Sequence, residues 1–407
     1  MIDNSDKFRE LGLINDICSA VADKGYTKPT EIQEKAIPVL LKNRDLIAVS
    51  QTGTGKTASF TLPLLHKIIM TKVNRHNGIR SLILVPTREL AIQVGENVKT
   101  YSKNLNLKIH TVLGGVNINP QMISLKGGAD ILIATPGRLL DLFDKNAINF
   151  KCLDTIILDE GDKLLDMGFE DELNRIISLL PTERQNLMFS ATFPDVVRVL
   201  SEKYLSNPVD IRVEEEITTA DTIEEWLYPV DKGKKNTLLL NLINTRGWDK
   251  VLVFAKSQNR VDRLLRFLEG KDVNVDSIHG GKTQFARTET LEAFKNGKTN
   301  ILVATDIASR GIDITSLPVV INYDLPHVAE NYVHRIGRTG RAGNEGIAIS
   351  FACGEEFEDL IKIERQIQTH IQRQVIEGFE PVEILRKSPK IRALKPKKPK
   401  KNRPKTS

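Results

Sequence analysis

The chain has few cysteines and no long apolar run. Its three cysteines, Cys18, Cys152 and Cys353, lie far apart and are odd in number. They match neither a disulfide framework nor a zinc-binding spacing, so we expect free thiols in a reducing compartment. No apolar stretch approaches the roughly 18 residues that cross a bilayer. Residues 1–10 also lack the apolar core of a secretion signal, so the sequence predicts a cytoplasmic globular protein.

Acidic residues are absent from the end of the chain. Residues 386–407 hold eleven of the 58 Lys and Arg residues, which leaves 47 basic against 52 acidic residues elsewhere. The segment is also proline-rich and has little apolar surface to bury, so we expect a disordered basic tail over residues 381–407. A sequence-independent attraction to a polyanion is the functional interpretation, and a merely solvated tail is the alternative.

The length of 407 residues exceeds what one hydrophobic core usually serves, which predicts two domains. Short β-branched apolar runs alternate with helical patterns, as in an α/β fold whose mainly parallel sheets are flanked by helices. The expected strands are residues 45–49, 81–85, 131–134, 155–158 and 186–189, then 251–254, 274–278, 300–304, 319–323 and 347–351. We expect an N-terminal domain over 1–209, a linker over 210–221 and a C-terminal domain over 222–380.

A phosphate-binding loop is predicted after the first strand pattern. Its glycines let the backbone curl around phosphates, and the following helix N-terminus adds a favourable dipole. Lys56 can reach the β and γ phosphates of ATP, and Thr57 can ligate Mg²⁺. Ser50 stands where the strict pattern has glycine, and a chance Gly-Lys turn is the disfavoured alternative. The candidate cofactor-binding residues here are Ser50, Gln51, Thr52, Gly53, Thr54, Gly55, Lys56 and Thr57.

Two acidic residues directly follow the strand pattern at 155–158. Asp159 would hold Mg²⁺, and Glu160 would position or deprotonate the attacking water. Alone, such a pair is better explained as a helix N-cap. Its combination with a phosphate-binding loop favours the catalytic interpretation.

These residues and their neighbours resemble the DEAD-box family of RNA helicases in superfamily 2, up to about Phe379. The resemblance implies two tandem RecA-like domains that use ATP and Mg²⁺. Phe8, Tyr26 and Gln33 stand in the segment that resembles the family's adenine-recognising Q motif. The Gln33 amide can pair with the donor and the acceptor of adenine, and an aromatic ring can stack on the base.

The family's namesake motif is present as residues 159–162 with Gly161 in place of alanine, and we expect hydrolysis to be retained. Residues 190–192 resemble the segment that contacts Asp162 and couples hydrolysis to strand separation through Ser190 and Thr192. Further motifs suit contacts with RNA phosphates and sugars, although each alone would be an ordinary capped turn. Their residues are Pro86, Thr87, Arg88, Gly114, Gly115, Thr135, Pro136, Gly137 and Arg138.

The second half of the chain carries the remaining motifs. Residues 304–313 resemble motif V, in which Thr305 would contact RNA and Gly311 and Asp313 would lie at the ATP ribose. Residues 277–284, with Gly280, resemble a loop that grips RNA phosphates. Residues 334–341 match motif VI closely. By this resemblance His334 and Arg335 belong to the coupling set, and Arg338 and Arg341 reach the γ-phosphate, with Arg341 as the arginine finger.

The resemblance implies an RNA-dependent ATPase that locally unwinds short RNA duplexes or remodels RNA–protein complexes by ATP-driven domain closure. The pattern at residues 8–13 and the basic tail resemble the bacterial RhlE-type group. A DNA helicase of the same superfamily is one alternative. An RNA clamp that binds ATP but scarcely hydrolyses it is another, and only Gly161 favours it. The RNA substrate stays open among ribosome assembly, messenger decay and cold adaptation, with ribosomal or RNA-decay proteins as candidate partners.

Overall fold

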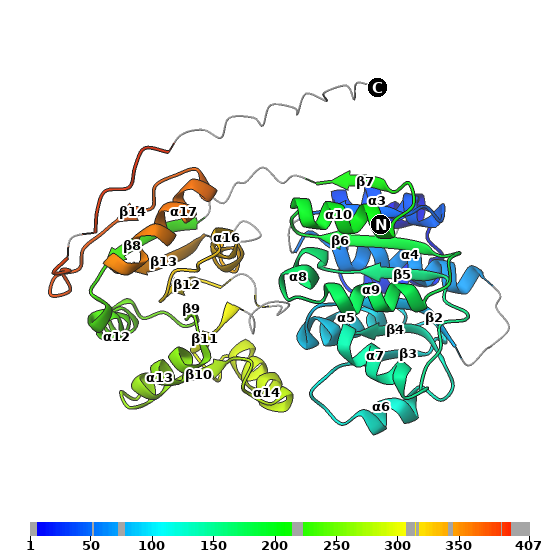
Figure 1. The fold of residues 1–407 in the computed structure, drawn as a ribbon, viewed down its shortest axis with the longest axis horizontal. Coiled ribbons are helices and arrows are strands. Elements are labelled where there is room, and N and C mark those ends of the chain that lie inside the picture. Colours follow the sequence, from blue (N-terminus) through cyan, green and yellow to red (C-terminus); the bar gives the residue numbers. More distant parts are fainter. Residues whose placement is uncertain are drawn as a thin grey trace, which may run out of the picture. The chain divides into compact units, whose positions relative to one another are not determined.

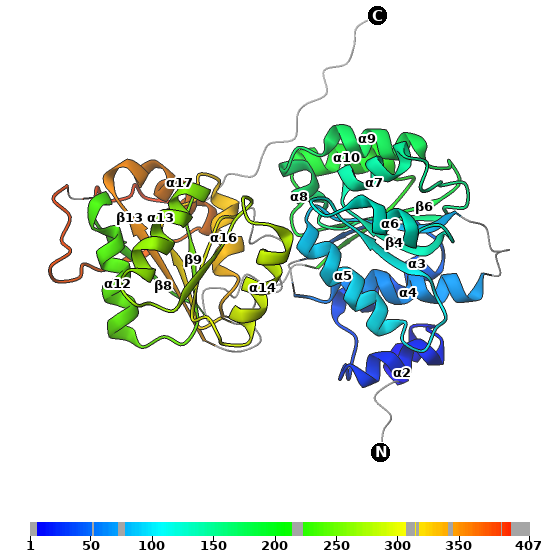
Figure 2. The same cartoon turned by 90° about the horizontal axis from the view of Figure 1, so that it is seen from below.

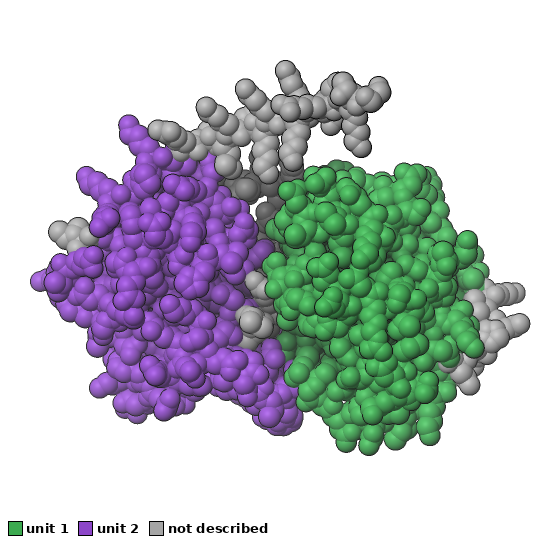
Figure 3. All heavy atoms as spheres, viewed as in Figure 1, with its two compact units in different colours: residues 1–217, 310–313 green, residues 218–309, 314–407 purple. Residues whose placement is uncertain are grey.

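The structure is a computed structural model in which residues 6–50, 53–71, 78–213, 223–306, 314, 317–340, 345–383 and 385–391 are described. These residues divide into two compact units (Figure 3). The described residues up to 213 form unit 1, and those from 223 form unit 2. Within these ranges, no helix combines the length and the apolar character needed to cross a membrane.

Each unit holds a seven-stranded sheet whose neighbouring strands are parallel (Figure 1). The order is β3-β4-β2-β5-β6-β1-β7 in unit 1 and β10-β11-β9-β12-β13-β8-β14 in unit 2. Numbered within its own unit, each order is 3-4-2-5-6-1-7, so the two units repeat one topology. The carboxyl ends of all strands of a unit therefore meet at one edge of its sheet, where ligands of such folds bind.

The strands of unit 1 are β1 (Leu46–Val49), β2 (Ile79–Leu84), β3 (Ile109–Val112), β4 (Ala129–Ala134), β5 (Thr155–Leu158), β6 (Gln185–Ser190) and β7 (Val209–Arg212). Its helices are α1 (Asp6–Glu10), α2 (Asn15–Asp23), α3 (Glu31–Leu41), α4 (Lys56–Met70), α5 (Arg88–Tyr101), α6 (Ile118–Ser124), α7 (Pro136–Asp144), α8 (Gly161–Asp166), α9 (Glu170–Leu179) and α10 (Asp195–Tyr204).

The strands of unit 2 are β8 (Ile223–Pro229), β9 (Val251–Phe254), β10 (Val275–Ile278), β11 (Ile301–Ala304), β12 (Val319–Asn322), β13 (Gly346–Ala352) and β14 (Gln372–Arg373). Its helices are α12 (Lys235–Arg246), α13 (Gln258–Glu269), α14 (Gln284–Lys295), α16 (Ala329–Ile336) and α17 (Phe357–Ile367), with short 3₁₀ turns η1 (Lys232–Lys234) and η2 (Gly354–Glu356).

Side chains along the central strands point alternately to the two faces of the sheet. Each unit therefore has two hydrophobic cores, one on each face. In β2, Ile83 joins the core formed with α1 to α5, whereas Leu82 and Leu84 join the core formed with α7 to α10. Figure 2 shows these two helix layers of unit 1 on opposite sides of its sheet. Because both faces are covered, the central strands read as continuous apolar runs in the sequence.

The α/β fold predicted from the sequence is confirmed, and each of the ten expected strands is present with ends shifted by at most two residues. The four strands that the sequence did not reveal are β3, β7, β8 and β14. Three of them are edge strands, and β8 is next to an edge. An edge strand is only half covered, so polar residues interrupt the apolar run that identified the others.

Two predicted boundaries differ from the structure. Strand β7 continues the first sheet to Arg212, three residues beyond the expected domain end at 209. The expected disorder from residue 381 is wrong for residues 385–391, since Leu385 is buried in the core of α16 and α17. Arg373 also donates to the carbonyls of Leu385 (3.2 Å) and Arg386 (2.7 Å). One apolar anchor and one arginine hold a segment whose average composition suggests disorder. Residues 392–407 lie outside the described ranges.

Candidate functional site

The phosphate-binding loop lies between β1 and α4, as predicted. Gly53 and Gly55 have φ values of 93° and 94°, a left-handed conformation that favours glycine. Lys56 is buried, and its Nζ donates to the Ser50 carbonyl at 2.6 Å. The Ser50 hydroxyl contacts the Thr54 hydroxyl at 3.0 Å, so serine at this position ties the loop to itself. Gln51 and Thr52 lie outside the described residues.

Gln33 connects α3 to this loop. Its Oε1 accepts from the Thr30 backbone N–H at 3.1 Å, and its Nε2 donates to the Gly55 carbonyl at 3.2 Å. A Cβ on Gly55 would lie 2.4 Å from Gln33 Nε2, so glycine is required there for space as well as for conformation. The structure therefore brings the predicted adenine-binding amide onto the phosphate loop, with its amide engaged by the protein.

The two aromatic candidates of the Q motif have different environments. Phe8 is completely buried in the core of unit 1, so no face of its ring is exposed for stacking. Tyr26 is half-buried, and its hydroxyl contacts the hydroxyl of Tyr101 at 3.1 Å. Of the two rings, Tyr26 is the one with an accessible surface.

Asp159 and Glu160 stand at the carboxyl end of β5, and both are buried. Burial and, second to it, the neighbouring charge of Glu160 raise the pKa of Asp159 to about 7, against the opposing charge of Lys56. Burial likewise lowers the pKa of Lys56, although Asp159 and Glu160 oppose this shift. The structure thus brings the phosphate-loop lysine and the acidic pair into one electrostatic site.

Glu160 has an unusual backbone conformation for a side chain that is not glycine, with φ 52° and ψ 52°. Such a left-handed conformation costs about 1–2 kcal/mol and is concentrated at functional sites. Glu160 precedes α8, but its side chain forms no cap hydrogen bond to the helix. The N-cap explanation for the acidic pair therefore fails for Glu160, and its catalytic role stays a prediction.

Asp162 contacts residues 190–192, as predicted. The Thr192 hydroxyl and backbone N–H donate to Asp162 Oδ2 at 2.8 and 2.9 Å, and the Asp162 backbone N–H donates to the Ser190 hydroxyl at 3.2 Å. Burial favours the neutral form of Asp162, but the bond from Thr192 and the charges of Lys163 and Lys56 outweigh it and lower the pKa. Asp162 is therefore a firmly ionised residue that joins β6 to α8.

Gly161 does not need to be glycine for conformation or for space. Its φ is not positive. A Cβ built on it would lie 3.3 Å from Cγ of Met188, the end of a flexible side chain, and farther from other atoms. An alanine would need a shift of only a few tenths of an ångström in Met188. Having glycine in place of alanine here therefore does not change where the three carboxylates of this motif lie.

The predicted RNA-facing residues of unit 1 gather at the carboxyl ends of three adjacent strands, β3, β4 and β2. The guanidinium of Arg88 lies over Gly115, where a Cβ would be 2.1 Å from Nη1. Arg138 is buried and donates from Nη2 to the Val116 carbonyl at 2.9 Å. Its Nη1 has no hydrogen-bond partner among the described residues. Nη1 is itself buried, and Nε of the same guanidinium lies 3.6 Å from Asp141 Oδ2.

The caps of two helices complete this surface. Thr87 caps α5 through a bond from the Leu90 backbone N–H at 3.3 Å. Thr135 occupies the N-cap position of α7, followed by Pro136 at the first helical position. Both helices therefore begin at the same sheet edge as Arg88 and Arg138, and helix N-termini favour anions.

In unit 2, Arg335 of motif VI is buried and bound within the unit. Its Nε and Nη2 donate to the two carboxylate oxygens of Asp306 at 2.6 and 2.7 Å. Nη1 donates to Asn322 Oδ1 (3.0 Å) and to the Asp324 carbonyl (2.7 Å), and the guanidinium lies 4.9 Å from the Phe254 ring centroid. Arg335 therefore fixes α16 to the ends of the central strands.

The other predicted residues of unit 2 are partly described. Arg338 is buried and follows the end of α16, whose last turn contains His334. The Thr305 N–H donates to the Ile278 carbonyl at 3.3 Å, and Gly280 is exposed beside Gln258. Gly311, Asp313 and Arg341 lie outside the described residues.

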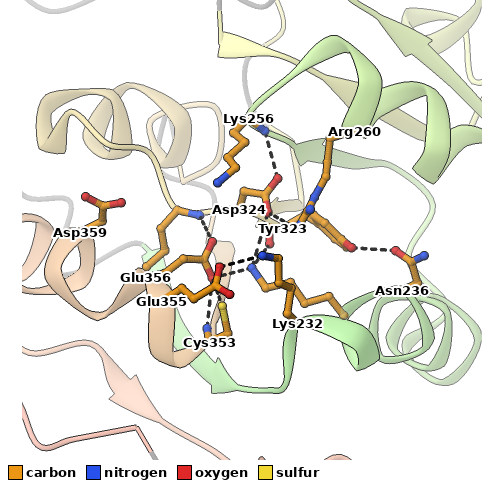
Figure 4. A network of polar contacts seen from close by, with 12 residues as sticks. Lys232, Asn236, Lys256, Arg260, Tyr323, Asp324, Cys353, Glu355, Glu356 and Asp359 are labelled. Carbon is orange, nitrogen blue, oxygen red and sulfur yellow. Dashed lines mark hydrogen bonds and ion pairs between the residues drawn. The ribbon is translucent and has the colours of Figure 1, made fainter.

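Sequence reasoning missed a buried charge network in unit 2. Lys235 is fully buried and donates to Glu356 Oε2 at 2.6 Å and to the Tyr323 carbonyl at 2.8 Å. Figure 4 shows Asp324 between Arg260 and the Lys256 backbone, with bonds of 3.0 and 3.1 Å. Because the Asp324 carbonyl also accepts a hydrogen bond from Arg335, the network helps to hold motif VI in position. Its only sequence signal is a polar residue directly after the β12 strand pattern.

The fold and this site define a protein of the P-loop nucleotide-binding class, built from two α/β units of one topology. Residues 30–200 match the DEAD/DEAH box helicase family, and residues 234–343 match the helicase conserved C-terminal domain. The ATP-dependent RNA helicase CshA of Listeria monocytogenes is 42% identical over 366 residues, which are 90% of this chain and 70% of that protein. The helicase RhpA of Helicobacter pylori is 39% identical over 365 residues, 90% of this chain and 73% of that protein.

Solved structures agree with these matches. S. cerevisiae Dbp5 bound to RNA and ADP BeF3 is similar with a TM-score of 0.79 and 31% identity, over 91% of this chain and 95% of that chain. Mss116p bound to ssRNA and AMP-PNP is similar with a TM-score of 0.79 and 28% identity, over 92% of this chain and 80% of that chain. The two units are RecA-like domains, and the chain belongs to the DEAD-box family of ATP-dependent RNA helicases.

Proposed function

We propose that the protein is an RNA-dependent ATPase that locally unwinds short RNA duplexes and remodels RNA–protein complexes. The observation that carries this proposal is the buried cluster of Lys56, Asp159 and Glu160 at the phosphate loop, in a chain of this family. The RNA-bound structures of similar proteins support RNA as the partner. RNA would contact the surface around Arg88 and Arg138 through its backbone and without reading sequence.

ATP hydrolysis would use Lys56 on the β and γ phosphates and Glu160 on the attacking water. Thr57 and Asp159 would hold Mg²⁺, which supplies charge neutralisation on the phosphates when it is bound. The residues fit this ion: burial and the charge of Glu160 raise the pKa of the Asp159 carboxyl in spite of Lys56 and Lys163, and a bound divalent cation would oppose that shift. No group of three or more His, Cys, Asp or Glu residues forms a metal cage in the described ranges, and Mg²⁺ typically needs only one or two carboxylates besides phosphates and water.

The C-terminal domain, expected over residues 222–380 after a linker at 210–221, would complete the ATP site. Arg338 and Arg341 would act on the γ-phosphate, and Gly311 and Asp313 would lie at the ribose. An arginine finger of this kind is worth about 10³–10⁵ in rate. Since ATP gains these contacts only when the domains close, ATP favours the closed state, and RNA that spans both domains favours the same state.

The basic tail would add sequence-independent affinity for RNA. Because residues 385–391 pack onto unit 2, a clean test removes residues 392–407 only. We expect weaker RNA binding and a log–log salt slope that flattens by about 0.7 for each phosphate that the tail no longer neutralises, with ATP hydrolysis retained. An unchanged salt slope after this deletion would refute a role of the tail in binding.

Finer assignments also belong to this proposal. The pattern at residues 8–13 supports the RhlE-type group, and three unpaired cysteines support a cytoplasmic location. Ribosomal or RNA-decay proteins are the candidate partners. Pull-down with the tagged full chain, with and without ribonuclease, measures this directly, and enrichment of neither class would exclude both.

Duplex separation is the activity that tests the remodelling proposal. We expect ATP-dependent release of a strand from a short RNA duplex and little release from a long one. Thr192→Val removes the hydroxyl donor to Asp162 and keeps the shape of the side chain. This variant should retain most RNA-stimulated hydrolysis and lose strand release. If wild-type protein hydrolyses ATP but never separates a short duplex, it is better described as an ATP-binding clamp.

A further inference from the structure

Lys163 forms a buried ion pair with the proposed catalytic glutamate. Its Nζ lies 2.6 Å from Glu160 Oε1, and the two side chains are 4% and 6% exposed. Lys163 is the third residue of the six-residue helix α8, which is too short for its dipole to explain a buried lysine. The contact with Glu160 does explain it.

The two oxygens of the Glu160 carboxylate have different surroundings. Oε1 accepts from Lys163, whereas Oε2 is buried and has no hydrogen-bond partner among the described residues. A buried acceptor without a partner costs about 1–3 kcal/mol. One oxygen is thus held in place by the protein, and the other is available to accept a hydrogen bond from a ligand.

The direction of this carboxylate depends on two constraints. The left-handed backbone of Glu160 sets where its side chain leaves the chain. Lys163, three residues later, fixes the position of the carboxylate through its bond to Oε1. The backbone N–H of Lys163 donates to Asp162 Oδ1 at 3.0 Å. Since α8 starts between Glu160 and Lys163, the ion pair ties Glu160 to the helix that also carries Asp162.

We propose that Lys163 is a positioning residue for ATP hydrolysis. It holds Oε1 of Glu160 so that Oε2 faces the attacking water, and it contacts no nucleotide itself. This inference rests on the ATPase proposed above and extends it to a residue outside the family's motif. A misplacement of a catalytic group by about 1 Å costs roughly 10²-fold in rate, so the contact has a measurable consequence.

A purely structural role is the competing explanation. Three carboxylates and Lys56 surround Lys163, and a second cation could serve only to balance charge. The two roles differ in one respect. A positioning residue acts through Glu160, so its effect disappears when Glu160 no longer works, whereas a charge-balancing residue keeps its effect.

The test is a double-mutant cycle on the full chain with Lys163→Met, Glu160→Gln and the double variant. Single-turnover ATP hydrolysis at saturating single-stranded RNA gives the rate, and a fluorescent ATP analogue gives the affinity. We expect Lys163→Met to lower the rate by about 10–100-fold with little change in affinity. In the Glu160→Gln background, Lys163→Met should have no further effect. Lys163→Arg should restore most of the rate, because it keeps a cationic donor.

Lys67→Met is the matched control. Lys67 is also a largely buried lysine of unit 1. It donates to Thr155 (2.8 Å) and Gln185 (3.2 Å) at the N-terminal ends of β5 and β6, away from Glu160, which follows the carboxyl end of β5. It should lower the melting temperature and leave the rate per folded molecule unchanged. If Lys163→Met does not fold, Lys163→Gln replaces it in the cycle, because glutamine is polar but neutral and one atom shorter than lysine, so it removes the ion pair with Oε1.

The outcomes separate this inference from the proposed function. Equal rate losses from Lys163→Met in both backgrounds, or a loss of affinity without a loss of rate, would overturn the positioning role. Wild-type protein without RNA-stimulated hydrolysis would overturn the ATPase and this inference together. Wild-type turnover with a non-additive cycle supports both.

Discussion

The two units repeat one sheet topology, but their buried charges differ in how completely they are paired. In unit 2, Lys235, Asp324 and Glu356 each have close partners of opposite charge. In unit 1, Asp159 has its pKa raised to about 7 by burial and by Glu160, and Glu160 keeps an oxygen without a hydrogen-bond partner in the described residues. The same fold therefore carries buried carboxylates whose oxygens are all bonded in one copy, although Arg260 Nε lacks a partner there among the described residues, and a buried carboxylate with one unbonded oxygen in the other.

This difference indicates where ligands act. A folded chain leaves buried charges short of partners mainly where a substrate supplies the missing partner. The strained backbone of Glu160 lies in the same place, which is the usual association of strain with function. The network of unit 2 instead holds Arg335 and the end of β12 in position. We therefore propose that the first cluster carries the chemistry and that the second supports the fold of unit 2.

The largest expected effect is loss of activity from unit 1. Lys56→Met removes the phosphate-loop cation and should lower kcat for ATP by at least about 10²–10³-fold. The free energy of unfolding should change by no more than about 1 kcal/mol, because burial already disfavours the charge of Lys56 and Asp159 can take up a proton near neutral pH. Steady-state ATPase assays and urea denaturation measure the two quantities. A large loss of stability in Lys56→Met would show that the buried charges of unit 1 also support its fold, and the two units would then not differ in this respect.

The converse effect is expected in unit 2. Lys235→Met leaves Glu356 buried without its cation and should lower the free energy of unfolding by about 3–5 kcal/mol. Lys232→Met is the matched control, because Lys232 pairs with Glu355 at the surface, where both side chains are more than half exposed. We expect little measurable change for the control. Urea denaturation followed by fluorescence distinguishes them, and equal midpoints would show that the buried network does not support the unit.

The smallest effect is expected at Gly161. Gly161→Ala should raise the free energy of unfolding by about 0.4–1 kcal/mol and leave ATP turnover nearly unchanged, because the new methyl group requires only a small shift of Met188. Gly168→Ala is the control: Gly168 has φ 80°, so alanine is strained there and should destabilise. Denaturation and ATPase assays test both. A strong loss of turnover in Gly161→Ala would show that the glycine itself tunes the site.

Much of the fold could be predicted because central parallel strands are covered on both faces and read as apolar runs. Three of the four edge strands, β3, β7 and β14, could not, since residues such as His110 in β3 and Asp210 in β7 interrupt the run. The packing of residues 385–391 was missed for a related reason. A single buried leucine, Leu385, does not alter the composition of a basic segment.

The candidate site was predictable where a motif has fixed spacing along the chain. The strand–turn–helix context of Lys56 and the contact of Asp162 with Thr192 both agree with the sequence. Contacts set by tertiary structure were not predictable. Nothing in the sequence marks Lys163 as the partner of Glu160, and the complete burial of Phe8 does not follow from its motif.

The most direct test of the central claim is steady-state ATP hydrolysis by the full chain with single-stranded RNA, with single-stranded DNA and with neither. Glu160→Gln serves as the blank, because it removes the negative charge of the Glu160 carboxylate and keeps the shape of the side chain. We expect strong stimulation by RNA alone, and we expect Glu160→Gln to abolish it. Equal stimulation by DNA would contradict the RNA assignment, and ATP binding without turnover in the wild-type protein would contradict the assignment of chemistry to unit 1.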